Sequence, residues 1–140
     1  MPKQGIPIVQ TDLAGRATAA LEFARAAEEA FHRAAVAFAL TQLNVAITFC
    51  KVCRLALASS SNHTRIERDL DHVEHALASA LRIKQQARLN ANERKQFRGK
   101  VQQLEALVTL LALRLPGPRM KAIEVCLKRF QQLSSPSPSY

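Results

Sequence analysis

The sequence has few of the residues that interrupt helices or build sheets. Its 140 residues include only four glycines and six prolines, and neither type occurs between Gly15 and Gly99. Tryptophan is absent, and no segment alternates β-branched or aromatic residues with polar ones in the manner of a strand. Apolar residues make up 48% of the chain and are mostly alanine and leucine, which favour helix. The sequence therefore predicts an all-α fold, an antiparallel helical bundle of four or five helices with a long N-terminal helix.

Cysteine is also scarce. The three cysteines, Cys50, Cys53 and Cys126, are an odd number and lie in apolar, helix-like stretches. Such a pattern is poor support for a disulfide framework and is typical of a reducing compartment. The first residues contain no continuous apolar run of signal-peptide length. We therefore expect a cytoplasmic protein.

Breaks in the helical pattern divide the chain. Pro2, Gly5 and Pro7 predict an irregular arm over residues 1–10, and serines and prolines predict a flexible tail over 134–140. Residues 11–133 are expected to form a single domain. Polar clusters at residues 59–64 and 90–92, with Asn92 as a candidate N-cap, and the Pro116-Gly117-Pro118 stop give four expected helices: 12–58, 64–89, 93–115 and 118–133. Short connections predict that consecutive helices are antiparallel neighbours.

Each of the last three helices has one apolar stripe, at the spacing of a surface that packs on a core. The predicted core residues on these stripes are Ile66, Leu70, Val73, Leu77, Leu81, Phe97, Val101, Leu104, Val108, Leu111, Ile123, Leu127 and Phe130.

The first expected helix differs because it has two apolar stripes. One follows a heptad spacing and is dominated by alanine, which lets another helix approach closely: Leu13, Ala17, Ala20, Ala24, Ala27, Phe31, Ala34 and Phe38. The other begins at Val36 and continues through Leu40, Leu43, Ile47, Cys50 and Leu57. Three short helices are too few to cover both stripes. Either the helix breaks near Phe31-His32-Arg33 and folds back, or a second copy packs on it.

These stripes supply the predicted partner surface. Its members are the apolar residues Leu13, Ala17, Ala20, Ala24, Ala27, Phe31, Phe38, Leu40, Leu43 and Ile47. The same region holds the most apolar stretch, Ala34 to Cys50, which includes Thr41, Gln42, Asn44 and Thr48. That stretch is slightly short for a bilayer, and two amides would lie near its centre. The sequence therefore favours a buried helix over a membrane span, and no membrane partner is predicted.

Two cysteines and two histidines are candidate ligands for a metal ion. Cys50 and Cys53 are three apart, and His72 and His75 occupy similar heights on the following antiparallel helix, a set of ligands that would suit zinc. The two histidines, however, lie roughly 140–160° from the apolar stripe of their helix at ~100° per residue. Side chains on opposite faces cannot share an ion. The sequence predicts buried structural cysteines, no metal and no cofactor.

No catalytic constellation appears elsewhere in the chain. The four glycines are isolated, so no glycine-rich loop cradles a phosphate. The serines at 59–61 and the acid pair Glu28-Glu29 lack the geometry of a nucleophile with its base or of an acid and base pair. We expect a protein that is not an enzyme, with no small-molecule substrate.

Charge is placed unevenly. The net charge is +9, and residues 51–140 carry all of the excess. Residues 82–100 hold seven basic side chains and one acidic one, Glu93. Cations at the end of a helix complement its dipole, whereas those at Arg94, Lys95 and Arg98 lie in first turns, where the dipole disfavours them. The predicted anion-binding or nucleic-acid-binding residues are Arg82, Arg88, Arg94, Lys95 and Arg98. A solvated basic face is the simpler interpretation.

Two functions follow from these patterns. The first is a non-catalytic helical protein–protein interaction or self-assembly module, whose partner is the chain itself, as a homodimer, or another helical protein. The second is a nonspecific nucleic-acid-binding protein that uses residues 82–100, where no aromatic residue other than Phe97 is available for base stacking.

Overall fold

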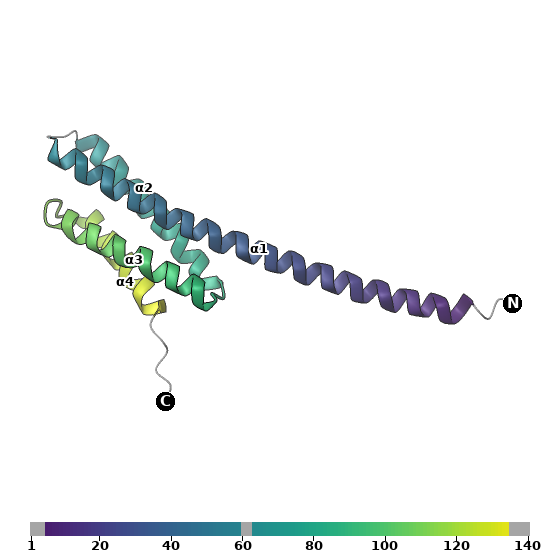
Figure 1. Ribbon diagram of the computed structural model, residues 1–140. Coiled ribbons are helices and arrows are strands. Elements are labelled where there is room, and N and C mark those ends of the chain that lie inside the picture. The colour runs from purple at the N-terminus through teal and green to yellow at the C-terminus, as the bar shows by residue number, and fades with distance from the viewer. Residues whose placement is uncertain (1–4, 60–62, 135–140) are drawn as a thin grey trace, which may run out of the picture. The chain divides into compact units, whose positions relative to one another are not determined.

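The computed structural model describes residues 5–59 and 63–134, and the side chains of 13–59 and 63–132. Four helices account for nearly all of these residues (Figure 1): α1, Gly5–Ala58; α2, His63–Gln86; α3, Ala91–Ala112; and α4, Pro118–Ser134. The predicted all-α bundle with a long N-terminal helix is confirmed. The chain divides into two units, residues 1–34 and 35–140. The predicted single domain of residues 11–133 remains a prediction.

The helix boundaries differ from those expected from sequence. Helix α1 begins at Gly5 and continues without interruption past Phe31, His32 and Arg33. Residues 5–10, which were predicted to be an irregular arm, are therefore helical. Pro7 is tolerated because it lies in the first turn, where its missing N–H costs no hydrogen bond. The rest of the arm, residues 1–4, and residues 135–140 of the predicted tail lie outside the described residues.

The start of α3 also differs from the one expected from sequence. Asn90, and not Asn92, is the N-cap, because Asn90 and Glu93 form a capping box. The Asn90 Oδ1 atom accepts a 2.7 Å hydrogen bond from the Glu93 N–H, and Glu93 Oε1 accepts one of 2.9 Å from the Asn90 N–H. Two backbone donors are thereby satisfied at once.

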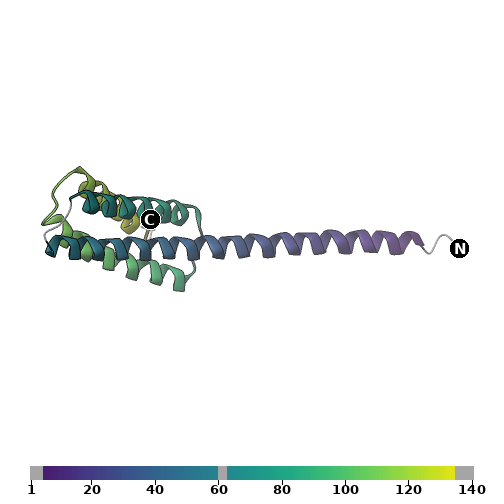
Figure 2. The same ribbon diagram turned by 90° about the horizontal axis from the view of Figure 1, so that it is seen from above.

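Within residues 35–140, α1 lies beside α2 and α3, and α4 lies beside the same two helices. The Cys53 Sγ–H donates to the Ile66 carbonyl at 3.8 Å, and Lys100 Nζ donates to Asn44 Oδ1 at 2.7 Å. Arg119 of α4 binds Asp71 of α2 at 3.1 Å. Helices α2 and α3 are joined by a short connection but lie diagonally across the bundle, as the two views show (Figures 1 and 2). They are consecutive but are not the neighbours that the short connection predicted.

The core lies between the four helices of this unit. The predicted stripes of α2, α3 and α4 all contribute to it. From α1 it receives seven residues: Val36, Ala39, Leu43, Ala46, Ile47, Cys50 and Cys53. One face of this part of α1 therefore belongs to the core.

Candidate interaction surfaces

The N-terminal face of α1 is the most apolar exposed surface of residues 13–34. We define this face as Leu13, Ala17, Ala20, Ala24, Ala27, Phe31 and Ala34. All seven of its residues are exposed, as are Leu21 and Phe23 on its flanks. The four large side chains Leu13, Leu21, Phe23 and Phe31 are between 58% and 78% exposed. Soluble monomers rarely leave so many large apolar groups together in water.

The remaining predicted partner residues, in the 35–140 unit, have different surroundings. Phe38 is half-exposed at 50%, and Leu40 packs partly against the core. Leu43 and Ile47 are buried in the bundle itself, so they cannot contact a partner in this conformation. Their stripe faces α2 and α3, which supply the cover that the sequence could not assign. Leu43 and Ile47 are therefore core residues, and Phe38 alone of these four is well exposed.

The same segment of α1 satisfies the composition of a membrane helix. Leu13–Ala58 is long and apolar enough to cross a membrane, and its most apolar window has a mean hydropathy of 1.6. That window is 39% buried inside the protein. Its buried residues, among them Val36, Leu43 and Ile47, pack against other helices. Part of the hydropathy of this window therefore belongs to core residues.

Cys50 and Cys53 are both fully buried, as predicted for structural cysteines. Burial raises the pKa of Cys50 to about 12, with a further contribution from Cys53. Burial, with Asp69 and Glu67, raises the pKa of Cys53 to about 11. Thiols held in the protonated form are poor nucleophiles and poor metal ligands at neutral pH.

His72 and His75, the two histidines considered as zinc ligands, are exposed on the side of α2 that was expected from the sequence. The His72 ring stacks on Phe49 at 4.6 Å between centroids, and His75 Nδ1 lies 2.9 Å from the Asp71 carbonyl oxygen. Within the described residues, no group of three or more His, Cys, Asp or Glu side chains could hold a metal ion.

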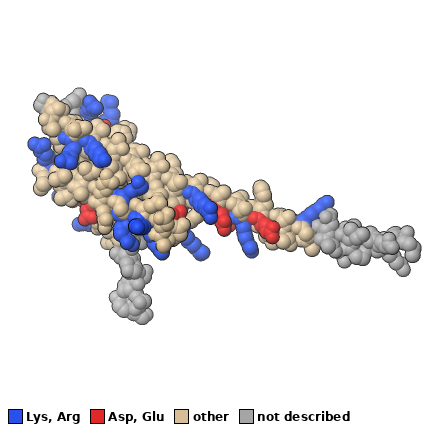
Figure 3. Space-filling model, viewed as in Figure 1, with Lys and Arg blue, Asp and Glu red and all other residues tan. Residues whose placement is uncertain are grey.

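The cations of the basic region differ in their burial. Lys100 is bound to Asn44, and Lys84 is buried, with its Nζ donating to the Phe130 carbonyl at 3.2 Å. The five predicted anion-binding residues, Arg82, Arg88, Arg94, Lys95 and Arg98, are all exposed. Figure 3 shows Lys and Arg in several groups on the visible bundle surface, separated by uncharged residues and with few acidic side chains among them.

The sequence interpretation assigned Lys84 to the cations that complement the dipole at the end of its helix, and not to the core. Its Nζ lies 5.7 Å and 5.6 Å from the ring centroids of Phe97 and Phe130, within the range of a cation–π interaction. Burial, and secondarily Arg98, lowers its pKa. A signal was available, since Lys84 is seven residues after Leu77 and continues the apolar stripe of α2.

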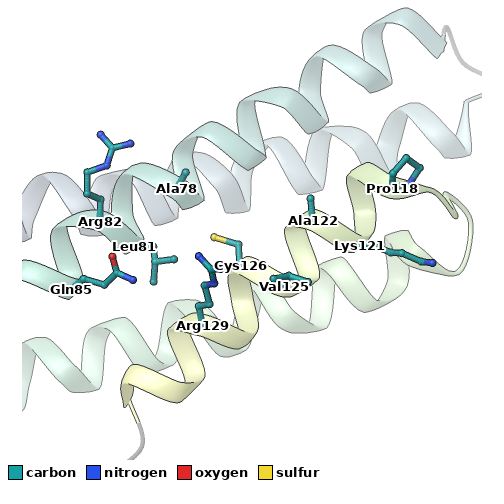
Figure 4. Close-up of a pocket in the computed structure, with 10 residues that line it drawn as sticks. All are labelled: Ala78, Leu81, Arg82, Gln85, Pro118, Lys121, Ala122, Val125, Cys126 and Arg129. Carbon is teal, nitrogen blue, oxygen red and sulfur yellow. The ribbon is translucent and has the colours of Figure 1, made fainter.

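A groove between α2 and α4 is the other surface feature that the sequence did not reveal. Its volume is about 550 Å³, and its floor is formed by small and apolar side chains from both helices (Figure 4). Arg82, Lys121 and Arg129 are at its rim. The groove lies wholly within the 35–140 unit.

Comparison with known proteins gives no relative: no family model, no curated protein and no solved structure matches this chain.

Proposed function

We propose that this chain is a non-catalytic helical protein–protein interaction module that assembles with a second copy of itself through the N-terminal face of α1. The observation that carries the proposal is the exposure of that face. Leu13 and Phe31 lie on it and Leu21 and Phe23 flank it, all more than half exposed. Burying such side chains is worth roughly 1.5–3 kcal/mol each.

The order of large and small residues favours an antiparallel pair. If Ala24 of one copy faces the partner's Ala27, then Phe31 faces the partner's Ala20 and Ala17 faces the partner's Ala34. Phe31 of each copy then packs on an alanine, which lets the helices approach closely in the middle of the contact, and Leu13 meets the partner's Phe38 at each end. A parallel pair in register would place Phe31 on Phe31 and alanine on alanine, so that the helices would have to separate at one end.

Charge is compatible with this pairing. Glu22, Glu29, Arg25 and Arg33 project away from the centre of the N-terminal face at ~100° per residue, and Glu28 lies on its flank. Arg16 shares the direction of Ala34, eighteen residues later, so it lies at the edge of the seam, where it is exposed. The centre of the seam is free of charge. Light scattering of the full chain tests the proposal: the expected mass is that of a dimer or larger assembly, and a stable, soluble monomer would contradict it.

A second function, nonspecific nucleic-acid binding, is favoured by one observation. Arg94 and Arg98, at a spacing of four residues on α3, are exposed on the same side of the helix. Both are in the first two turns, where positive charge is disfavoured by the helix dipole, so an anion there would offset the mutual repulsion of the cations.

A gel shift with duplex DNA at low and moderate salt tests this alternative. Each phosphate contact that is lost should reduce the slope of log affinity against log salt by about 1. Arg94→Glu/Arg98→Glu is therefore expected to weaken binding and lower the slope by about 2. Arg65→Glu/Arg68→Glu, which makes the same charge change at exposed positions of α2, is the matched control. Absence of any shift at low salt would remove the alternative.

A further inference from the structure

The groove between α2 and α4 has the volume and the apolar lining of a small-molecule site. Its volume of about 550 Å³ lies within the range of ligand pockets, about 300–1,000 Å³. Ala78 and Leu81 of α2 face Ala122, Val125 and Cys126 of α4 across it (Figure 4). Val125 is 52% exposed although it is apolar. The small side chains of Ala78 and Ala122 leave room for the groove between the two helices, and Leu81 and Val125 give it an apolar lining.

The rim of the groove is positively charged. Arg82, Lys121 and Arg129 line it, and no carboxylate does. In the described part of the chain, none of these three cations has an acidic partner at ion-pair distance. Glu67 and Asp71 of α2 are bound by Arg119, at 3.3 Å and 3.1 Å. Glu74 of α2 acts electrostatically on the Cys126 thiol in the groove, so one carboxylate lies within electrostatic range of it. The three cations of the rim outnumber this acid, and the groove therefore presents net positive charge beside apolar surface.

The polar groups are not spread evenly along the groove. Arg82, Gln85 and Arg129 lie toward one end, and Pro118 and Lys121 lie toward the other (Figure 4). The Arg129 guanidinium and the Gln85 amide offer N–H donors at this end, whereas the Arg82 guanidinium is turned away from Arg129 (Figure 4). A guanidinium group presents its donors in the planar geometry that carboxylates accept. The apolar lining then continues along the helices toward Pro118.

From this arrangement we infer that the α2–α4 groove binds a free single-chain amphipathic carboxylate, a fatty-acid-like anion. The carboxylate is bound by Arg129 and Gln85, Arg82 turns toward it by a change of rotamer, and the alkyl chain lies along Leu81, Ala122 and Val125. Nucleic acid is a poorer fit because no aromatic side chain lines the groove to stack on a base. This site is separate from the N-terminal face of α1 and does not depend on self-association.

Cys126 provides a built-in reporter for the experiment. It lines the groove and is partly accessible, whereas Cys50 and Cys53 are fully buried. Alkylation of Cys126 by iodoacetamide, a neutral reagent, is followed by mass spectrometry of the peptide that contains it. Since burial raises the pKa of this thiol despite the opposing effect of Arg129, the reaction is run at mildly alkaline pH, where more thiolate is present.

Decanoate, below the concentration at which it forms micelles, is the probe. It should slow alkylation of Cys126 by a factor of 1 + [L]/Kd, roughly tenfold when its concentration is about ten times its Kd. Acetate, which has the charge without the chain, and decanol, which has the chain without the charge, should each protect far less. Equal protection by decanol and decanoate would overturn the role of the cations.

Matched variants localise the effect. Arg82→Gln/Arg129→Gln should abolish most of the protection by decanoate, whereas Arg68→Gln/Lys128→Gln, with exposed cations of the same two helices outside the groove, should retain it. Rates with and without decanoate are compared within each variant, because loss of Arg129 itself changes the thiol. Two results would overturn the inference: no protection of the wild-type chain, or protection by phosphatidylglycerol vesicles without protection by decanoate.

Discussion

Replacement of Ala24 and Ala27 by glutamate is expected to convert the assembly into a soluble monomer. Both alanines are exposed in the isolated chain, so the new carboxylates meet water there and disturb no packing. In the proposed antiparallel pair, the two alanines of each copy face those of its partner, and four carboxylates would be buried together. Burying unpaired charge costs several kcal/mol for each group, which exceeds what the seam of small residues can supply.

The control for this variant is Ala19→Glu/Ala26→Glu. These alanines are also exposed on α1, but they lie roughly 120–140° from the centre of the N-terminal face at ~100° per residue. The residue types, the added charge and the change in helix propensity are the same in both variants. The solution mass should fall to that of a monomer only for Ala24→Glu/Ala27→Glu. A fall in both variants would show that charge alone, and not the face, controls assembly.

Raising the pH from 9 toward 11 is expected to lower the free energy of unfolding steeply. The pKa values of Cys50 and Cys53 rise from an ordinary 9.0 to about 12 and about 11 in the folded protein. Between those values the thiols remain protonated when folded and ionise when unfolded. Their contribution to stability is therefore complete below pH 9 and is lost as pH rises. Each thiol accounts for about 1.4 kcal/mol per pH unit at most.

Lys84 acts in the opposite direction, because burial lowers its pKa and its charging cost in the folded state is relieved as pH rises. Burial also raises the pKa of Cys126, so three thiols are opposed by one amine and the net change should still be a loss. Urea unfolding followed by circular dichroism, with a reductant present, measures the effect. In Cys50→Ala/Cys53→Ala the loss of stability with pH should become much shallower. Identical pH dependence in the two proteins would contradict the assignment.

The sequence predicted the core more completely than the surfaces. Periodicity placed Leu77, Leu104 and Ile123 correctly, because an apolar stripe reports which side of a helix faces its neighbours whatever the topology. It did not reveal that α2 and α3 lie diagonally, since a short connection limits the distance between two helix ends and not the packing of the helices. The groove depends on that arrangement, and it could not be predicted from either helix alone.

The surroundings of some individual residues likewise could not be predicted from the sequence. Asn90 and Asn92 are equally good caps by residue type, and only the reciprocal bond with Glu93 selects Asn90. Leu43 and Ile47 were assigned to a partner surface because the number of neighbours around α1 was unknown. The exposed residues from Leu13 to Phe31 were predicted as a seam. In the proposed assembly, a second copy covers them.

Hydrogen exchange of the backbone amides of residues 13–34, measured in the full chain over a range of protein concentrations, tests that covering most directly. A helix with no tertiary packing opens at little free-energy cost, whereas a helix buried in a dimer is protected for as long as the dimer persists. The account predicts slow exchange that becomes faster on dilution, and fast exchange at every concentration in Ala24→Glu/Ala27→Glu. Fast exchange of the wild-type segment, independent of concentration and equal to that of the variant, would contradict it.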